Sequence, residues 1–243
     1  MPLYGTEADL AASWLSEDEI ERVNRYRFKE HRHAFCAGRA FLRLVLAQYI
    51  GVLPQAIRFR LGARSKPELD QPASARWLQF SLARSDAFVM LAVAMRSPVG
   101  IDIERVRDDF DLTQTARCHF TEPEFESWMA LPAVQRPRAF FALWTRKEAF
   151  LKGTGTGIDR PLDRLVLPIK AGGLANDAKA APGQDGGGRW SIVEVATPPS
   201  HAAALATGWA SPEIFQSRLR FGASQEPFPA GVFGPRSERW LDV

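Results

Sequence analysis

In the first hundred positions, the spacing of hydrophobic and polar residues is first typical of helices and then typical of strands. A capping box at Ser16-Glu17-Asp18-Glu19 predicts the start of a first helix. Apolar residues three and four positions apart predict a second helix over 30–50, with Gly51 as its stop. Period-two or continuous apolar patterns predict strands over 56–61, 78–82 and 88–95, the last of them buried on both faces. The intervening segment 62–72 is turn-rich and basic.

In the second half, residues 99–104 alternate apolar and acidic side chains, which is typical of a strand. A second capping box, Thr121-Glu122-Pro123-Glu124, predicts another helix start. A longer helix is predicted to begin near Pro137, which a first turn tolerates, and to end at Lys152 with Gly153 as its stop. Further strands are predicted over 162–167, 190–195 and 201–207, and a glycine-rich loop over 171–188.

A short internal repeat suggests how these elements are organised. Arg39-Ala40-Phe41-Leu42-Arg43 is echoed by Glu148-Ala149-Phe150-Leu151-Lys152, and a capping box precedes each at a similar distance. Two interpretations stay open: chance agreement between common helix formers, or a chain of two similar halves. On the second, we expect an α+β fold of two pseudo-symmetric α/β halves, over 1–97 and 98–225, with a tail over 226–243.

The composition is that of a globular chain with a mild positive charge. Of 243 residues, 46% are hydrophobic, enough for a sizeable core, and 31 basic against 28 acidic residues leave a net charge of +3. That excess does not favour a nucleic-acid partner. Two cysteines and four histidines show no zinc spacing. Since no apolar segment approaches the roughly 18 residues that span a bilayer, we expect a soluble, cytoplasmic protein without membrane contact.

Four charged residues of the second half fall into register. A strand over 99–104 places Asp102 and Glu104 on one face, and the helix that ends at Lys152 places Glu148 one turn before it. Neighbouring carboxylates repel one another unless a cation neutralises them, and oxygen ligands suit Mg²⁺. The residues therefore indicate a metal and phosphate site. The plainer alternative is two solvated strand-edge acids and an ordinary helix ion pair.

The two segments that carry these charges resemble a known signature. Gly100-Ile101-Asp102-Ile103-Glu104, followed by Trp144-Thr145-Arg146-Lys147-Glu148-Ala149-Phe150-Leu151-Lys152, is similar to the paired motif of the Sfp-type 4'-phosphopantetheinyl transferases, and a looser likeness extends over about 15–209. The resemblance implies a fold of two α/β halves with the active site in the cleft between them. It also implies transfer of 4'-phosphopantetheine from coenzyme A to a serine of an apo acyl or peptidyl carrier protein, with release of adenosine 3',5'-bisphosphate.

The same resemblance assigns roles to the charged cluster. Asp102, Glu104 and Glu148 match the family's ligands for Mg²⁺, with Mn²⁺ as a substitute. Displacement at phosphorus builds up charge on the phosphate oxygens, and the attacking serine must lose a proton, for which Glu148 is our candidate base. Lys152 matches a lysine beside the phosphate, although it could instead balance the helix dipole. Asp102 and Lys152 therefore count as both catalytic and coenzyme-binding.

Cations from the first half are expected to bind the coenzyme phosphates. Arg64 and Lys66 match basic positions that contact the coenzyme in the family, and Arg22 matches more loosely, with a solvated side chain as the equal alternative. After Phe80 the chain departs from the family pattern: Ser81-Leu82-Ala83-Arg84-Ser85 replaces Asn, an apolar residue, Ser and His. We expect Arg84, together with Ser81, to take over the phosphate contact of that histidine, because its guanidinium is permanently charged and forked.

An acidic carrier protein would need basic and apolar contacts. Basic residues cluster near the first helix, and three aromatic residues follow the acidic strand: Arg22, Arg25, Arg27, Lys29 and Arg32, then Phe120, Phe125 and Trp128. The alternative for the basic cluster is a solvated helix face. We expect a monomer.

A rival function is a non-catalytic module that binds coenzyme A or acidic partners. It is disfavoured because three carboxylates facing a phosphate would weaken anion binding. A nucleic-acid binder would need a stronger charge and an aromatic platform.

Overall fold

The computed structural model describes residues 11–62, 66–155, 167, 169–170, 173–174, 190–209, 213–216, 218–220 and 240–242. The chain forms two compact units, one of residues 1–56 with 211–243 and the other of residues 57–210. Helices and small, mostly antiparallel sheets occur together, which confirms the α+β class. None of the helices in the described ranges is long and apolar enough to cross a membrane.

The first unit is built on two helices. Its elements are α2 (Glu17–Asn24), α3 (Lys29–Ile50), the 3-10 turn η1 (Pro54–Ala56) and a parallel pair, β10 (Arg218–Arg220) and β11 (Trp240–Asp242). The capping box predicted at the start of α2 is confirmed, since the Ser16 backbone N–H donates to the Glu19 carboxylate at 3.1 Å. Helix α3 ends as predicted at Gly51, whose φ of +68° favours glycine.

The second unit opens with two antiparallel hairpins and a central strand. Its first elements are β1 (Arg58–Leu61), β2 (Pro67–Gln71), η3 (Ala73–Ala75), β3 (Leu78–Ser85), β4 (Phe88–Met95) and β5 (Val99–Arg105). Two predictions were wrong here. The turn-rich segment 62–72 contains strand β2, and β4 is half-buried rather than buried on both faces. In the described part of the chain β4 is the edge of a two-stranded sheet, so Phe88 and Met95 at its ends are exposed.

The remaining elements of this unit are mostly helical until the chain returns to the sheet. They are α4 (Leu112–His119), α5 (Glu122–Met129), η4 (Ala133–Gln135), α6 (Arg136–Thr154), β6 (Ile169–Lys170), β7 (Gly173–Leu174), β8 (Ser191–Glu194) and β9 (His201–Thr207). The strands predicted over 190–195 and 201–207 and the capping box at Thr121 are confirmed. Most of the predicted strand 162–167 and of the loop 171–188 lies outside the described residues.

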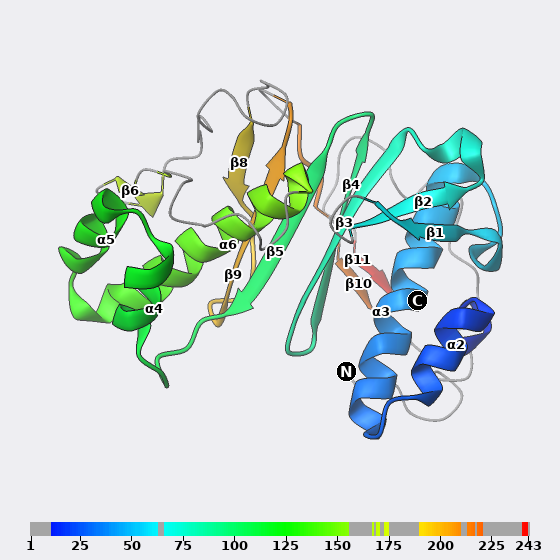
Figure 1. Ribbon diagram of the computed structural model, residues 1–243, viewed down its shortest axis with the longest axis horizontal. Coiled ribbons are helices and arrows are strands. Elements are labelled where there is room, and N and C mark those ends of the chain that lie inside the picture. Colours follow the sequence, from blue (N-terminus) through cyan, green and yellow to red (C-terminus); the bar gives the residue numbers. More distant parts are fainter. Residues whose placement is uncertain are drawn as a thin grey trace. The chain divides into compact units, whose positions relative to one another are not determined.

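Helix α6 covers one face of the antiparallel sheet β5-β9-β8 (Figure 1). Three alanines of β9 are fully buried in the core shared with α6, and such small side chains let the helix approach the strands closely: Ala202, Ala204 and Ala206. The opposite face of β5 buries Ile101 and Ile103 among residues of β3 and β4. Strand β5 therefore separates an aliphatic layer from the layer that faces α6.

Glycines set the distance between β5 and α6. A Cβ on Gly100 would lie 1.9 Å from the carbonyl oxygen of Ala149 and 2.3 Å from the backbone nitrogen of Gly153, so the two backbones are in direct contact. The predicted helix stop at Gly153 was wrong. The helix continues to Thr154, and Gly155, with φ +68°, ends it. Gly153 is glycine because a Cβ there would lie 2.6 Å from Trp190.

Candidate active site

Asp102 and Glu104 lie on the face of β5 that α6 covers. Their partners across the ladder to β9 are Ala204 and Ala202, members of the core beneath α6. Strand alternation thus separates the two acids from Ile101 and Ile103, as the sequence predicts. Asp102 is buried, with 3% of its surface exposed, and Glu104, nearer the end of the strand, is half-buried.

Helix α6 brings Glu148 and Lys152 to these acids. The Lys152 ammonium lies 2.6 Å from Asp102 Oδ1 and is partly exposed, while the Asp102 carboxylate is almost fully buried. Glu148 precedes Lys152 by one turn and is half-buried. The other oxygen of Asp102, Oδ2, is buried without a hydrogen-bond partner among the described residues. One lysine therefore satisfies only part of a three-carboxylate cluster.

The electrostatics of the cluster are those of under-compensated acids. Burial raises the pKa of Asp102 although the Lys152 charge and hydrogen bond oppose that shift. Burial, followed by the negative charge of Asp102, raises the pKa of Glu104 and likewise that of Glu148. All three shifts point in the direction that a nearby cation would reverse. Perturbed carboxylates of this kind are typical of functional sites.

The donor set fits a hard divalent cation. Within the described ranges no three acidic, histidine or cysteine side chains form a ready metal shell, and Asp102 is paired with Lys152. The oxygen donors and the unpartnered Asp102 Oδ2 nevertheless match what Mg²⁺ prefers. Asp102 and Glu104 on the strand and Glu148 on the helix would hold such an ion.

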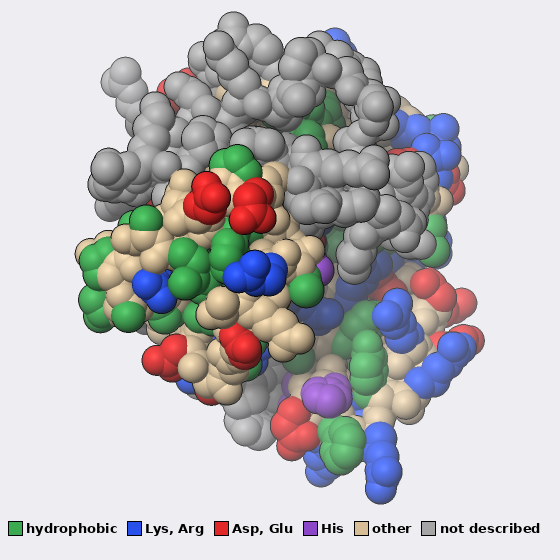
Figure 2. All heavy atoms as spheres, turned by 60° about the vertical axis from the view of Figure 1, so that its left-hand side comes forward, with side chains coloured by type: hydrophobic (Ala, Val, Ile, Leu, Met, Phe, Trp, Pro, Cys, Tyr) green, Lys and Arg blue, Asp and Glu red, His purple; other side chains and the backbone are tan. Residues whose placement is uncertain are grey.

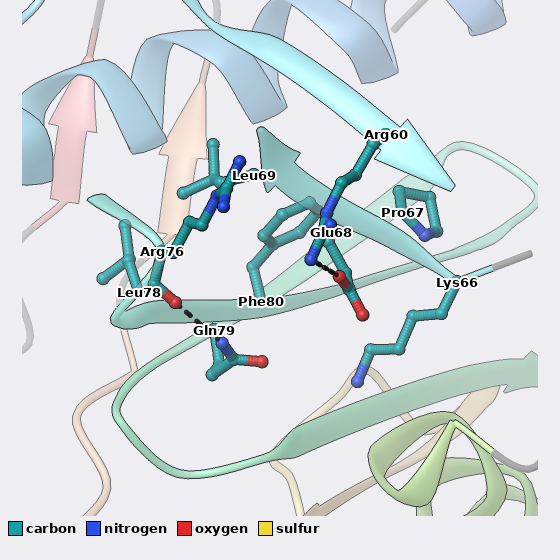
Figure 3. A pocket seen from close by; sticks show the side chains of 9 residues that line it. All are labelled: Arg60, Lys66, Pro67, Glu68, Leu69, Arg76, Leu78, Gln79 and Phe80. Atoms are coloured by element: carbon teal, nitrogen blue, oxygen red, sulfur yellow. Dashed lines mark hydrogen bonds and ion pairs between the residues drawn. The ribbon is translucent and has the colours of Figure 1, made fainter. Parts of the chain in front are cut away.

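The predicted coenzyme residues Lys66 and Ser81 both contact strand β5. The Lys66 ammonium donates to the carbonyl oxygens of Val99 and Gly153, at 3.1 and 3.4 Å. The buried Ser81 hydroxyl accepts a hydrogen bond from the Ile101 backbone N–H at 3.2 Å. Lys66 also borders a small pocket of about 120 Å³ (Figure 3). A coenzyme role for either residue stays a prediction.

The other predicted coenzyme residues are less closely tied to the cluster. Arg84 is exposed on β3, opposite Val89 of β4. Arg22 belongs to the first unit, where it is exposed and its guanidinium stacks 5.0 Å from the Phe35 ring centre. Arg64 lies outside the described residues.

One expectation about the carrier surface was wrong. Phe120, Phe125 and Trp128 are 4%, 7% and 2% exposed, because they form part of the hydrophobic core with α6, and so they offer no carrier contact. Most of the predicted basic cluster is exposed, namely Arg22, Arg25, Arg27 and Lys29, with Arg32 partly buried. On the face in Figure 2, basic and acidic side chains are interspersed, in keeping with the small net charge.

Two polar contacts that sequence patterns did not reveal support the site. The buried Lys147 ammonium lies 2.6 Å from Glu124, the capping-box glutamate of α5, and so fixes α6 next to that helix. The Ser85 hydroxyl accepts a hydrogen bond from the Arg105 backbone N–H at 2.9 Å. Lys147 belongs to the Arg-Lys-Glu motif at 146–148, but only the fold shows that its side chain faces inward and pairs with Glu124.

Comparisons with known proteins place most of the chain in one family. A family model described as 4'-phosphopantetheinyl transferase superfamily matches residues 98–205, and one described as 4'-phosphopantetheinyl transferase, N-terminal, matches residues 4–96. The 4'-phosphopantetheinyl transferase HetI of Nostoc sp. is 37% identical over 206 residues, covering 83% of this chain and 82% of that protein. The transferase Sfp of Bacillus subtilis is 27% identical, covering 71% and 74%.

Among solved structures, the ACPS-CoA complex of Chronobacterium ammoniagenes matches with a TM-score of 0.32 and 16% identity, covering 46% of this chain and 95% of that one, a likeness too distant to argue from. The sequence matches are sufficient without it. The chain belongs to the 4'-phosphopantetheinyl transferase superfamily. It is an enzyme that transfers the 4'-phosphopantetheine moiety of coenzyme A to a carrier protein, which answers the alternative of a non-catalytic binding module.

Proposed function

We propose that this transfer depends on Mg²⁺ held by Asp102, Glu104 and Glu148. The observation that carries the proposal is the cluster of one buried and two half-buried carboxylates, in which one Asp102 oxygen has no partner among the described residues. Burial raises the pKa of all three groups, and the charge of Asp102 further raises the pKa of Glu104 and of Glu148. Lys152, with a weaker contribution from Arg107 at Glu104, does not offset the effect of burial on the three carboxylates. A divalent cation supplies the missing charge and, when bound, neutralises the coenzyme pyrophosphate.

The residues around the cluster have distinct tasks in the transfer. The carrier serine Oγ forms a bond to the phosphorus that bears the pantetheine arm, and the bond from that phosphorus to the bridging pyrophosphate oxygen breaks. Adenosine 3',5'-bisphosphate leaves with the bond electrons. Glu148 Oε accepts the serine proton, because its carboxylate would lie beside the metal and the reacting phosphate.

Lys152 is suited to move between two anions. Its ammonium pairs with Asp102, yet 36% of its side chain is exposed. A rotation of the side chain can therefore bring the ammonium to a phosphate oxygen while the backbone of Lys152 stays in α6. There it would stabilise charge on the transferring phosphate. Coenzyme contacts are assigned to the remaining predicted cations and Ser81: Arg22, Arg64, Lys66 and Arg84.

The partner is an apo acyl or peptidyl carrier protein that offers an acidic surface, and the enzyme acts as a monomer. The exposed basic residues that begin at Arg22 and end at Lys29 support electrostatic docking of such a partner. With the predicted aromatic contacts buried, charge rather than apolar area should dominate the encounter, so association should weaken steeply with salt.

Mass spectrometry of carrier proteins tests the proposal. The purified enzyme is incubated with coenzyme A, Mg²⁺ and a panel of apo carriers from fatty-acid, polyketide and non-ribosomal peptide synthesis, with EDTA as the matched control. We expect one phosphopantetheine arm on at least one carrier, lost with EDTA and restored by excess Mg²⁺ or Mn²⁺. Transfer that continues unchanged in EDTA would refute the metal-dependent mechanism.

A further inference from the structure

Lys152 binds one of the oxygens that the proposed metal site needs. Its ammonium lies 2.6 Å from Asp102 Oδ1, and only 5% of the Asp102 side chain is exposed. The second oxygen, Oδ2, is buried without a hydrogen-bond partner among the described residues. Little water therefore reaches this carboxylate. The ion pair places a singly charged cation on the same group that would hold a divalent one.

Two cations on one buried carboxylate oppose each other. A Mg²⁺ ion lies about 2.0–2.1 Å from each carboxylate oxygen that it binds. An ammonium 2.6 Å from the same carboxylate would be close to that ion, in a place where little water screens their repulsion. The ion pair between Lys152 and Asp102 and the binding of a divalent ion to Asp102 should therefore weaken each other.

The Lys152 side chain has another place to go. Its backbone is held in α6, which continues to Thr154, but 36% of the side chain is exposed. A flexible four-carbon stem carries the ammonium, so rotation about its bonds moves the charge without any change in the helix. A coenzyme phosphate offers that charge a second anionic partner. Lys152 can thus leave Asp102 without being left unpaired.

We propose that Lys152 is an exchangeable counter-ion of the metal site, which pairs with Asp102 until a divalent ion binds and is then released to the coenzyme phosphate. This proposal rests on the proposed Mg²⁺-dependent function. The exchange couples the two ligands, because binding of the ion frees a cation for the phosphate. Each ligand should therefore raise the affinity for the other beyond their direct contact.

The competing role for Lys152 is a fixed partner that only orients Asp102. A group that orients a metal ligand strengthens metal binding, so its removal typically weakens that binding about 10- to 100-fold. A counter-ion that competes with the metal has the opposite effect when it is removed. The sign of the change in metal affinity therefore separates the two roles.

The test compares Lys152→Met with the wild-type enzyme, because methionine keeps an unbranched apolar side chain and removes the ammonium. Calorimetry measures Mn²⁺ binding without coenzyme at about pH 8, well above the ordinary pKa of carboxyl groups. We expect Mn²⁺ to bind Lys152→Met at least about fivefold more tightly, the lower end of the usual coupling between two sites. Saturating Mn²⁺ should also raise the affinity for coenzyme A more in the wild type than in the variant, which has no cation to release.

Arg107→Met is the matched control. The Arg107 charge also acts on Glu104, but its side chain is 57% exposed and lies near Asp109 rather than Asp102. Its removal should change the Mn²⁺ affinity by less than about twofold, because exposed charges are screened. Circular dichroism checks that each variant folds, and Lys152→Gln, which also removes the charge, replaces Lys152→Met if that variant does not fold.

Three results would contradict the exchange. Unchanged or weaker Mn²⁺ binding in Lys152→Met would overturn the proposal and make Lys152 a fixed partner of Asp102. Equal tightening in Lys152→Met and Arg107→Met would overturn it as well, because a general charge effect would then suffice. If neither the wild type nor Lys152→Met binds Mn²⁺, the metal site on which the proposal rests is itself refuted.

Discussion

The helix pair α2/α3 of the first unit and the pair α5/α6 of the second unit share one construction. In each, a short helix begins with a capping box whose glutamate is buried and ion-paired with a cation of the long helix. Glu19 lies 2.6 Å from the Arg43 Nε, and Glu124 lies 2.6 Å from the Lys147 ammonium. Each of these carboxylates also caps its own short helix. In both pairs the buried charge fastens one helix to the other.

The two long helices differ at the positions of the sequence echo. Arg39 and Arg43 of α3 both pair with Glu19, and the hydroxyl of Ser16 accepts another bond from Arg43. The corresponding residues of α6 are Glu148 and Lys152, which face the acids of β5 instead. The division into two pseudo-symmetric halves stays a prediction, but the contrast in charge does not depend on it.

The pKa shifts express this difference in chemical terms. Burial would raise the pKa of Glu19, but the Arg43 hydrogen bond and the Arg39 charge hold it below its ordinary value. The pKa values of Asp102, Glu104 and Glu148 are raised by burial. A buried carboxylate with enough cations is structural, whereas a buried cluster with too few can bind a further cation. Removing Glu19 should therefore cost stability, whereas removing an acid of the Asp102 cluster should cost activity.

Asp102→Ala should have the largest effect of the variants considered, a loss of activity without a loss of the fold. Loss of a metal ligand should lower the transfer rate by at least about 10²–10³-fold, the usual effect of removing one transition-state stabilising group. The fold should persist, because Asp102 is a poorly compensated buried charge and not part of the apolar core. Carrier mass spectrometry and thermal unfolding measure the two effects. Asp70→Ala, at an exposed pair with Arg76, is the control, and wild-type turnover in Asp102→Ala would disprove the site assignment.

Glu19→Gln should have the opposite signature. It leaves the buried Arg43 guanidinium without its counter-charge, and breaking such a pair typically costs about 3–5 kcal/mol of stability. Urea unfolding followed by circular dichroism measures the loss. Glu21→Gln, which removes only an exposed pair with Arg25, should behave like the wild type. Equal stability of the Glu19 and Glu21 variants would show that Glu19 is not a structural anchor.

The dependence of the unfolding free energy on pH at acidic values should test the structural role of Glu19 further. Because the folded-state pKa of Glu19 is lowered, its stabilising contribution is complete above its ordinary value of 4.5 and is lost as the pH falls through the folded-state value. In unfolding free energies measured between about pH 3 and 7, Glu19 should thus contribute a fall toward acid, which the raised pKa values of Asp102, Glu104 and Glu148 oppose. The slope should be smaller in Glu19→Gln. A variant with the full wild-type slope would assign the acid sensitivity to other groups.

Arg84→Ala should have the smallest effect. The exposed guanidinium is assigned to a coenzyme phosphate, and one charge-assisted contact is worth about tenfold in affinity. The apparent KM for coenzyme A should rise by that order, while kcat stays near the wild-type value. Arg96→Ala, at another exposed position, serves as the control. An unchanged KM would show that Arg84 does not touch the phosphates.

Much of the fold could be predicted because the local signals act over few residues. The capping boxes at Ser16 and Thr121, the Gly51 stop and the alternating strand with Asp102 follow from hydrogen-bonding and periodicity rules that hold within one or two turns. Periodicity also placed Asp102 with Glu104 on one strand face and Glu148 with Lys152 on one helix face, but that strand and helix meet was implied by the family resemblance and not by spacing.

Long-range packing could not be predicted from those rules. The helix stop predicted at Gly153 is wrong because this glycine is needed for close contacts with Trp190 and Gly100. Those contacts come from distant segments, which a local pattern does not reveal. Phe125 and Trp128 were assigned to a carrier surface, since an amphipathic pattern does not say whether its apolar side meets the core or a partner. The hydrogen bond from Lys66 to Gly153 spans 87 residues, and nothing local to either residue marks it.

The most direct test of the central claim is a carbon-13 NMR titration of the side-chain carboxyls of Glu19 and Glu148, assigned with Glu19→Gln and Glu148→Gln. We predict a pKa below the ordinary value for Glu19 and above it for Glu148. Saturating Mg²⁺ should lower the Glu148 pKa and leave that of Glu19 unchanged. If both groups titrate in the same direction, or if Mg²⁺ leaves Glu148 unaffected, the distinction between a compensated anchor and a metal-binding cluster is wrong.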